Sequence, residues 1–597
     1  MAVIPPRDLN AAASVSDTDV LIVDKGSSVE KALPSQIVDA AIPLASQVEA
    51  EAGTDNAKRV TPLRVKQAID AIGVSADSLA AGLATRVSTS ALADPEGAAL
   101  AGFKQLGVGA ANRNVLEKLR DTISAKDFGA AGDGVTNDTP ALQAAIDSFG
   151  AGGGTVIVPY GMRCLVDASL TVKSNVSLVG PHEYIGSPNN NTDAPYGSVG
   201  GALIVNSSAT ITLKGGASLK GLLIYRKGMT FPAANSSAFA GTAVTIGGDD
   251  AAASCSMILG FEKAVLSDGY QRPRFYNLWL DNVNGISITD AYDIPRIENV
   301  HCWPFATIEQ YAIDLLPSQL QRSGTAFLLE GVSDWVKLNN CFAYGYSRGF
   351  DLNNVNTPTL VSCTVDGTAP PNVLAGSRGF SIRGTSYDAK LIGCQAASQE
   401  IGFYLDTDAN IQNQLIDCIA WNGTSHGFFI GSGDWVFMGG ATRQVSNGIL
   451  YNNAASRVTL RGFQFGASLT NPINLNVTPT TGFVDFDGVQ APSVAAGGTL
   501  VAGTSATISV ASAQPLLVPA TGRAFNITGS TNFSNLQSGW AGREVTLIFT
   551  GALTVVSGTG APDAIRLKGN SNFTTTAGST LTLWHNGTQW YEKSSAA

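Results

Sequence analysis

A short pattern that recurs between Gly285 and Phe465 restricts the fold of this 597-residue chain more than any other feature of the sequence. Each copy pairs a small residue with an aromatic or branched one, and another apolar residue follows two positions later. The copies begin at Gly285-Ile286, Ala326-Phe327, Gly349-Phe350, Gly379-Phe380, Gly402-Phe403, Gly427-Phe428 and Gly448-Ile449. From Phe327 to Phe428 the phenylalanines are spaced by 23, 30, 23 and 25 residues. Repeats of this length, with Gly, Asn and Asp turns, are typical of a solenoid of strands.

The alternation within each copy predicts which side chains face the interior. Residues two apart lie on the same side of a strand, so Phe350 and Leu352 face inward together and Asp351 faces outward. Stacked strands about 4.8 Å apart then align equivalent residues in ladders. The sequence therefore predicts a parallel β-helix with phenylalanine on phenylalanine. A cysteine follows each of the first five copies by 13 to 16 residues, which predicts a second ladder of Cys302, Cys341, Cys363, Cys394 and Cys418.

Composition and charge limit the classes of partner. Charged residues make up 14% of the chain and the formal net charge is −10, which argues against a nucleic-acid surface. The seven cysteines lack the close CxxC spacing of zinc sites or a disulfide framework, so buried free thiols are expected and no metal or other cofactor is predicted. We expect no membrane insertion, because no apolar run approaches about 20 residues. The N-terminus does not resemble a signal peptide, which predicts synthesis in a cytosol.

The chain divides into three predicted regions. Residues 1–123 contain short elements joined by Ala- and Ser-rich connectors and are expected to be ordered by a partner or by self-association. Residues 124–490 form the β-helix, and a helix over about 139–149, with Thr139 as its cap and Pro140 at its first position, is expected to cover the open end of the core. Residues 491–597 begin with a flexible linker and continue as a β-sandwich-like domain, with strands near 543–549, 552–556 and 581–591 and a hairpin turn at Asn586-Gly587.

The segment from Ser124 to Val158 carries a family resemblance. Asp127-Phe-Gly-Ala, the helix through Ala145-Ile146, and the strand after Gly152-Gly-Gly-Thr-Val resemble the opening of the pectate-lyase-like right-handed β-helix superfamily, and in particular bacteriophage tailspikes. The resemblance implies a homotrimer that resides in the virion tail, is assembled in the bacterial cytoplasm and acts outside the host cell. It also implies that residues 1–123 attach to phage tail or baseplate proteins, and that the C-terminal domain serves trimerisation or carbohydrate binding.

Candidate catalytic residues gather around one long repeat unit. The unit from Ile286 to Phe327 is 41 residues long, so about Trp303 to Gly324 must project as a loop. Glycoside hydrolysis needs two carboxyl groups, about 5–5.5 Å apart for retention or about 6.5–9.5 Å apart for inversion. Adjacent coils place stacked or diagonal carboxylates within that range, as for Glu330 with Asp351 or Glu298 with a loop carboxylate. The candidate acids are Asp293, Glu298, Glu309, Asp314, Glu330 and Asp351.

Outward aromatic residues suggest where a sugar chain would lie. The candidate binding residues are Tyr292, Arg296, His301, Trp303, Phe342, Tyr344 and Trp421. Exposed aromatics are costly unless covered, and the two alternatives are a glycan groove and a subunit interface. Three functions stay open: hydrolysis of a bacterial surface polysaccharide (capsule, O-antigen or exopolysaccharide), which is our first hypothesis; β-elimination on a uronic acid with His301, Arg296 or a tyrosine as base; and receptor binding without cleavage.

Overall fold

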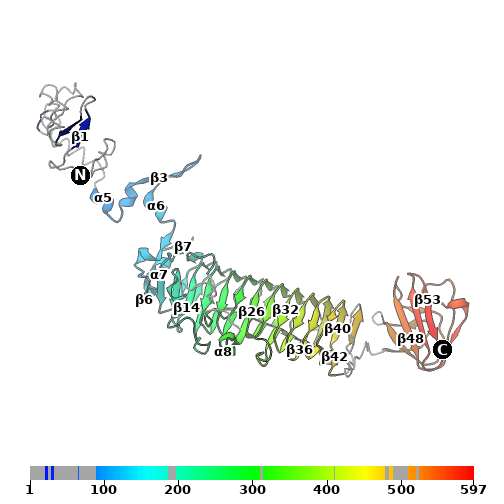
Figure 1. Ribbon diagram of the computed structural model, residues 1–597. Helices are drawn as coiled ribbons and strands as arrows, with labels where there is room; N and C mark the ends of the chain where they lie inside the picture. The colour runs from blue at the N-terminus through cyan, green and yellow to red at the C-terminus, as the bar shows by residue number, and fades with distance from the viewer. Residues whose placement is uncertain are drawn as a thin grey trace. The chain divides into compact units, whose positions relative to one another are not determined.

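A computed structural model describes residues 21–24, 29–32, 63, 65, 67, 89–185, 196–308, 314–408, 411–477, 483–487, 508–519 and 523–597. The chain divides into two compact units, Met1–Arg120 and Asp121–Ala597 (Figure 1). The described elements of the first unit are β1 (Leu21–Asp24), β2 (Val29–Ala32), α5 (Thr89–Ala93), η2 (Gly97–Leu100), β3 (Gly102–Lys104), β4 (Asn112–Asn114) and α6 (Val115–Leu119).

The second unit contains a parallel β-helix. Three long sheets run along it, with 14, 13 and 12 strands among the described residues. Each coil contributes one strand to the first, second and third sheet in turn, and every strand pair within these sheets is parallel (Figure 1). This arrangement is typical of a right-handed β-helix and confirms the predicted fold class.

The first sheet consists of β5 (Ile123–Ser124), β7 (Gly154–Ile157), β10 (Val176–Val179), β13 (Ser218–Lys220), β16 (Ala252–Ser254), β19 (Arg274–Tyr276), β22 (Arg296–Glu298), β25 (Lys337–Asn339), β28 (Thr359–Val361), β31 (Lys390–Ile392), β34 (Gln412–Ile416), β37 (Asp434–Met438), β40 (Arg457–Arg461) and β43 (Phe483–Asp487).

The second sheet consists of β6 (Asp133–Asn137), β8 (Arg163–Val166), β11 (Ala202–Val205), β14 (Leu223–Arg226), β17 (Met257–Leu259), β20 (Trp279–Asp281), β23 (His301–Cys302), β26 (Phe342–Tyr344), β29 (Thr364–Asp366), β32 (Gln395–Ala397), β35 (Ile419–Trp421), β38 (Ala441–Arg443) and β41 (Gln464–Phe465).

The third sheet consists of β9 (Leu170–Val172), β12 (Ile211–Leu213), β15 (Thr242–Ile246), β18 (Lys263–Asp268), β21 (Asn284–Thr289), β24 (Arg322–Asp334), β27 (Tyr346–Asn356), β30 (Arg378–Gly384), β33 (Ile401–Thr407), β36 (His426–Ser432), β39 (Asn447–Tyr451) and β42 (Asn471–Leu475).

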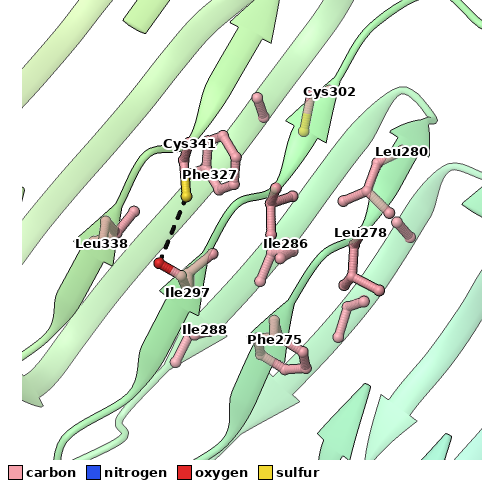
Figure 2. Packing of buried hydrophobic residues seen from close by; sticks show 14 of the residues in the cluster. Phe275, Leu278, Leu280, Ile286, Ile288, Ile297, Cys302, Phe327, Leu338 and Cys341 are labelled. Carbon is pink, nitrogen blue, oxygen red and sulfur yellow. Dashed lines mark hydrogen bonds between the residues drawn. The ribbon is translucent and has the colours of Figure 1, made fainter. Parts of the chain in front are cut away.

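The predicted phenylalanine ladder forms the centre of the core. Phe327, Phe350, Phe380, Phe403 and Phe428 are paired in register along the third sheet and are fully buried. Their rings stack almost in parallel, with centroids 4.6 to 4.8 Å apart. Figure 2 shows the interior at the first member of this ladder, where Phe327 and Ile297 of one coil and Phe275 and Ile286 of the preceding coil lie among buried side chains.

The cysteine ladder has four members instead of the five predicted. Cys341, Cys363, Cys394 and Cys418 are buried at equivalent positions next to Phe342, Thr364, Gln395 and Ile419, which pair in register. Cys302 instead pairs with Ala343, which lies two residues after Cys341 in the chain. Cys302 is therefore out of register with the other four cysteines.

The turn between the first and second sheets explains the difference. In the four coils of the ladder, one residue with positive φ makes this turn and the cysteine directly follows it, as Cys341 follows Asn340 (φ 50°). In the earlier coil Asn299 makes the turn (φ 53°), so Cys302 comes third instead of first. The position of a cysteine in the ladder therefore depends on its distance from the left-handed turn residue, and not on its distance from the phenylalanine.

The predicted capping helix is α7 (Thr139–Asp147), with Pro140 in its first turn. Its buried residues Leu142, Ala145 and Ile146 belong to the β-helix core. The N-cap residue is Asp138 rather than Thr139. The Asp138 carboxylate accepts hydrogen bonds from the backbone N–H groups of Ala131 and Gly132, at 2.7 and 3.1 Å, which ties the preceding loop to the helix.

A six-stranded mixed sheet lies in the predicted C-terminal region. Its strands, in sheet order, are β44 (Ile508–Ala511), β46 (Ala524–Thr528), β48 (Glu544–Phe549), β52 (Thr580–His585), β53 (Trp590–Ala596) and β50 (Ile565–Arg566). Two short pairs accompany it: β45 (Leu516–Leu517) with β47 (Leu536–Gln537), and β49 (Thr554–Val555) with β51 (Phe573–Thr574). The sheet has its own apolar core around Leu547, Leu581 and Trp590. The hairpin predicted at Asn586 joins β52 to β53.

In the part of the chain that the structure describes, no helix has the length and apolar character needed to cross a membrane.

Candidate functional site on the third sheet

The outer face of the third sheet carries a cluster of charged and aromatic side chains. In each coil the residue between the two inward apolar residues faces outward, which gives the aligned column Leu328, Asp351, Ser381, Tyr404 and Phe429. Two residues further along each strand, a second outward column aligns Glu330, Asn353, Arg383 and Asp406. We call the group Glu330, Arg348, Asp351, Arg378, Arg383, Tyr404 and Asp406 the third-sheet cluster.

Arg383 links the two carboxylates that the sequence singled out in neighbouring coils. Its Nε and Nη2 donate to Oδ1 and Oδ2 of Asp351 at 2.8 and 3.1 Å. The same Nη2 lies 3.8 Å from Oε1 of Glu330. Oδ2 of Asp351 and Oε1 of Glu330 both contact Nη2 of Arg383, so these two oxygens are at most about 7 Å apart. This separation is compatible with glycoside hydrolysis.

Asp351 and Glu330 differ in accessibility. Asp351 is only 1% exposed, and Arg348 adds a second guanidinium 3.7 Å from its Oδ2. A buried carboxylate that two guanidinium groups contact is held in a fixed place. Hydrogen bonding to Asp351 raises the pKa of Arg383. The side chain of Glu330 is about one-third exposed, so of the two acids it is the one that a sugar could contact directly.

An aromatic surface adjoins the charged groups. The rings of Tyr404 and Phe429 stack in parallel with centroids 4.8 Å apart, and the Arg378 guanidinium lies 3.6 Å from the centre of the Tyr404 ring. The Tyr404 hydroxyl donates to Oδ2 of Asp406 at 2.9 Å. Burial, followed by this hydrogen bond, raises the pKa of Tyr404, so the phenol stays protonated at neutral pH. Flat rings beside arginines suit a sugar ring that carries an acidic group.

Two further titratable groups with shifted pKa values belong to coils of the same region, one on the third sheet and one on the second. His426 opens β36, and burial lowers its pKa, so the imidazole is neutral at pH 7. Asp366 ends β29 in the second sheet, and burial raises its pKa. A neutral imidazole and a carboxyl group with a raised pKa are the forms used for proton transfer.

The aromatic strip predicted on the second sheet is covered by the chain itself. The residues of the projecting loop, including α8 (Pro317–Leu320), place Ile308 and Leu320 against Tyr344, with Trp303 and Phe342 partly buried beside them. The strip therefore forms neither an open groove nor a free interface at these positions. Trp421 on β35 lies beyond this loop cluster, three strands further along the sheet than β26, and has the Arg443 guanidinium 5.5 Å from its ring centre.

A buried ion pair anchors the projecting loop. Arg322, 1% exposed, donates from Nε and Nη2 to Oδ1 and Oδ2 of Asp281 at 2.7 and 3.0 Å. Nη2 also donates to Oγ1 of Thr307 at 2.7 Å, and the backbone N–H of Ala306 donates to Asp281 at 2.7 Å. The Asp281 carboxylate of β20 thus binds residues at both ends of the projecting loop.

His301 lies within an aromatic box beneath the loop. Its ring is 5.0 Å from that of Phe342 and 5.3 Å from that of Phe305, edge to face in both cases. Burial lowers the pKa of His301 to about 4. The aromatic surroundings account for this shift and make His301 part of the packing under the loop.

The remaining predicted residues lie on other faces or outside the described residues. Tyr292 and Asp293 are in the turn before the first sheet, and Oδ2 of Asp293 accepts a hydrogen bond from Arg272 at 2.8 Å. Arg296 and Glu298 are outward residues of β22 in the first sheet. Asp314 is exposed in the projecting loop, and Glu309 lies outside the described residues. Of the six predicted acids, only Glu330 and Asp351 share a contact residue within the described part of the chain. The catalytic and binding roles stay predictions.

Sequence reasoning missed most of the third-sheet cluster, although the repeat contained the signal. Arg348, Arg378 and His426 each stand directly before the Gly-Phe pair, and Tyr404 and Phe429 directly follow the phenylalanine. These are outward positions of the same strand. Within the described residues, no group of three or more His, Cys, Asp or Glu side chains is placed to hold a metal ion.

The start of the β-helix is similar to a known class of domain. Residues 122–226 match the family model "Rhamnogalacturonase A/epimerase, pectate lyase-like". This match covers the capping helix and the early coils, where the sequence resembles the same superfamily.

Individual proteins share shorter or more distant similarity. Mannuronan C5-epimerase AlgE2 of Azotobacter vinelandii is 55% identical over 62 residues, 9% of this chain and 6% of the epimerase. The tail spike protein of an Escherichia phage is 50% identical over 52 residues, 9% of this chain and 6% of that protein. Thus the chain spans only a small fraction of the length of these curated relatives. A tailspike protein of E. coli bacteriophage HK620 in complex with a pentasaccharide aligns with 85% of this chain and 97% of its own, at 13% identity and a TM-score of 0.43.

Proposed function

We propose that this protein is a phage tailspike that binds and depolymerises a bacterial surface polysaccharide at the third-sheet cluster. The observation that carries the proposal is the meeting of Glu330 and Asp351 at the Arg383 guanidinium, beside the stacked rings of Tyr404 and Phe429. Similarity to a tail spike protein and to a polysaccharide epimerase supports the same class of function.

Hydrolysis by two carboxyl groups is the first mechanism. Glu330 is the accessible acid or base, and Asp351 is the partner carboxylate within reach. Asp351 is screened by Arg383, so it contacts a sugar only when the guanidinium swings toward an acidic group of the substrate. The arginines therefore select an anionic glycan and couple its binding to exposure of the second acid.

β-Elimination is the second mechanism, and the pair of Arg378 and His426 favours it. Arg378 and His426 belong to one outward column of the third sheet, because both are aligned with Ile401. A guanidinium stabilises the negative charge that develops when a uronate loses its C5 proton, and a neutral imidazole accepts that proton. The electron pair left at C5 forms the C4–C5 double bond while the C4–O bond breaks, and the leaving oxygen takes a proton from water. Binding without cleavage remains the non-enzymatic alternative.

Incubation of the purified protein with the host polysaccharide tests these mechanisms. New reducing ends without ultraviolet absorbance indicate hydrolysis, and absorbance of an unsaturated uronate indicates elimination. We expect Glu330→Gln to lower the rate at least about 100-fold if hydrolysis operates, with Asp268→Asn, an exposed carboxylate two coils earlier in the same column, as the matched control. Binding with unchanged chain length would reject both enzymatic mechanisms.

We also propose that the protein is a homotrimer of the virion tail, attached to tail or baseplate proteins through residues 1–123. Assembly in the bacterial cytoplasm would precede action at the outside of the host cell. Similarity to the tail spike protein of an Escherichia phage supports this placement.

A further inference from the structure

Two aromatic side chains lie exposed and adjacent on the C-terminal sheet. Trp584 of β52 and Tyr591 of β53 face each other across the strand pair, with ring centroids 6.4 Å apart. They are 42% and 38% exposed, whereas their neighbours Leu583 and Trp590 are fully buried in the core. The alternation along each strand therefore directs both rings to the outer face of the sheet.

Polar groups frame this aromatic pair. Glu544 on β48 is aligned with Trp584, and Arg566 on β50 is aligned with Tyr591, so the row across the sheet has a charged residue at each end. Lys593 reaches over β52 to Glu544, with Nζ 2.6 Å from Oε2.

The next row of the same face is built largely from hydroxyl groups. The hydroxyls of Thr546 and Thr582 lie 3.1 Å apart, and Ser594 is aligned with Thr582 on the neighbouring strand. Obligate protein interfaces are hydrophobic. Neither this row nor the row of Glu544, Trp584, Tyr591 and Arg566 contains a large aliphatic side chain, so this face does not resemble such an interface.

We propose that Trp584 and Tyr591 form a saccharide-binding platform that is separate from the third-sheet cluster. Apolar ring faces pack against the C–H faces of sugar rings, and the surrounding carboxylate, guanidinium, ammonium and hydroxyl groups bond the sugar hydroxyls. Lys593 and Glu544 neutralise each other, and the Arg566 guanidinium is engaged by the carbonyl oxygen of Gly558, to which Nη1 donates at 3.2 Å, so the platform fits a neutral, hydroxyl-rich saccharide better than a polyanion. Two rings are too small a contact for a stable protein partner, which needs about 800 Å² on each side.

Trp540 provides a matched control within the same region. It is 50% exposed, but the Arg543 guanidinium lies 4.4 Å from its ring centre and occupies one ring face. Replacing it removes a comparable exposed indole and leaves the platform intact.

Native electrophoresis of the full chain through gels that contain dextran, yeast mannan or galactomannan tests the proposal. We expect retardation in at least one neutral polysaccharide, an increase of at least tenfold in the apparent Kd for the double variant Trp584→Ala, Tyr591→Ala, and a change of less than twofold for Trp540→Ala. Near-ultraviolet circular dichroism checks that the three proteins are folded alike.

Three outcomes would overturn the proposal: no retardation of the wild-type protein in any gel, equal retardation of the double variant, or a lower oligomeric mass of the double variant, which would make the pair an assembly contact. The Glu330→Gln variant separates this inference from the proposed depolymerase. It should be retarded like wild type in the neutral gels whether or not the third-sheet cluster cleaves its own substrate.

Discussion

Individual residues of this β-helix acquire their properties from the coils above and below them. Asp351 is an outward residue by strand alternation, yet it is buried because Arg348 and Arg383 fold over it. Asp281 is likewise outward in the second sheet and buried by Arg322 and the projecting loop. In both cases a carboxylate organises the backbone or the cations around it instead of facing solvent.

We predict that Arg322→Ala releases the projecting loop. The substitution leaves the Asp281 carboxylate buried without a counter-ion, which typically costs about 3–5 kcal/mol. The free energy of local opening of residues 304–308, measured by native-state hydrogen exchange, should fall by that order. Lys220→Ala, which breaks an exposed ion pair with Glu183, is the control and should leave the opening free energy of the loop almost unchanged. Equal effects of the two variants would contradict the anchoring role of Arg322.

We predict a pH dependence of the same loop that originates in His301. Burial lowers the pKa of His301 to about 4, whereas in the unfolded chain it titrates near 6.5. The unfolded form therefore binds the proton first, so stability is unaffected above about pH 6.5 and falls as the pH drops toward 4, by at most roughly 3 kcal/mol.

His301→Phe tests this prediction because phenylalanine suits the aromatic box of Phe305 and Phe342. Hydrogen exchange of the loop amides, corrected for intrinsic rates, should show a smaller loss of protection between pH 6.5 and 4 in the variant. An unchanged pH profile would place the titrating group elsewhere.

The stacked strand is the element that gives the β-helix its continuity. Each phenylalanine inside the ladder contacts one ring above and one below, as Phe380 does, so it stabilises two coils at once. The small residue before it is equally constrained, because a Cβ at Gly402 would meet the carbonyl oxygen of Gly427 at 2.6 Å. The Gly-Phe pair thus reflects close approach of adjacent coils at the corner between the second and third sheets.

We predict that Phe380→Ala destabilises its own coils and leaves distant coils intact. Removal of the ring opens a cavity between Phe350 and Phe403, which typically costs about 3–5 kcal/mol. In a solenoid this loss is local, since each repeat contacts only its neighbours. Hydrogen exchange should therefore accelerate in β27, β30 and β33, while β9 and β12 stay protected. Phe380→Leu is the milder control, and uniform loss of protection along the whole β-helix would contradict the prediction.

At the scale of the whole molecule, the three sheets present different outer faces. The third sheet carries the charged and aromatic cluster, and loops cover much of the second. The first sheet has an outward apolar column in its later coils, in which Val361, Ile392, Ile416 and Met438 are aligned in register. Such a column is costly to leave in water, and we expect copies of the chain to cover it.

We predict that the protein in solution is a trimer, with three times the 61.7 kDa mass of one chain. Light scattering coupled to size exclusion measures this mass. Ile416→Lys places a charge within the apolar column and should shift the population toward smaller species. Thr289→Lys, on the outer face of the third sheet, is the control. A monomeric wild type, or an unchanged mass for Ile416→Lys, would argue against this surface as the contact.

The amino-acid sequence by itself determined the β-helix, its capping helix and the stacking of Phe327 through Phe428. These features follow from local periodicity: alternation of two within a strand and a repeat of about one coil along the chain.

The tertiary structure decided the rest. Cys302 does not belong to the cysteine ladder predicted for it, because the left-handed turn at Asn299 sets the register of that coil. His301, Phe342 and Tyr344 are outward residues by strand alternation, but the projecting loop and the ring of Phe305 cover them. Glu330, Asp351 and Arg383 come from three successive coils, and their contacts exist only once those coils are stacked. Periodicity fixes which way a side chain points, whereas contacts between coils and loops depend on long-range packing that no local pattern encodes.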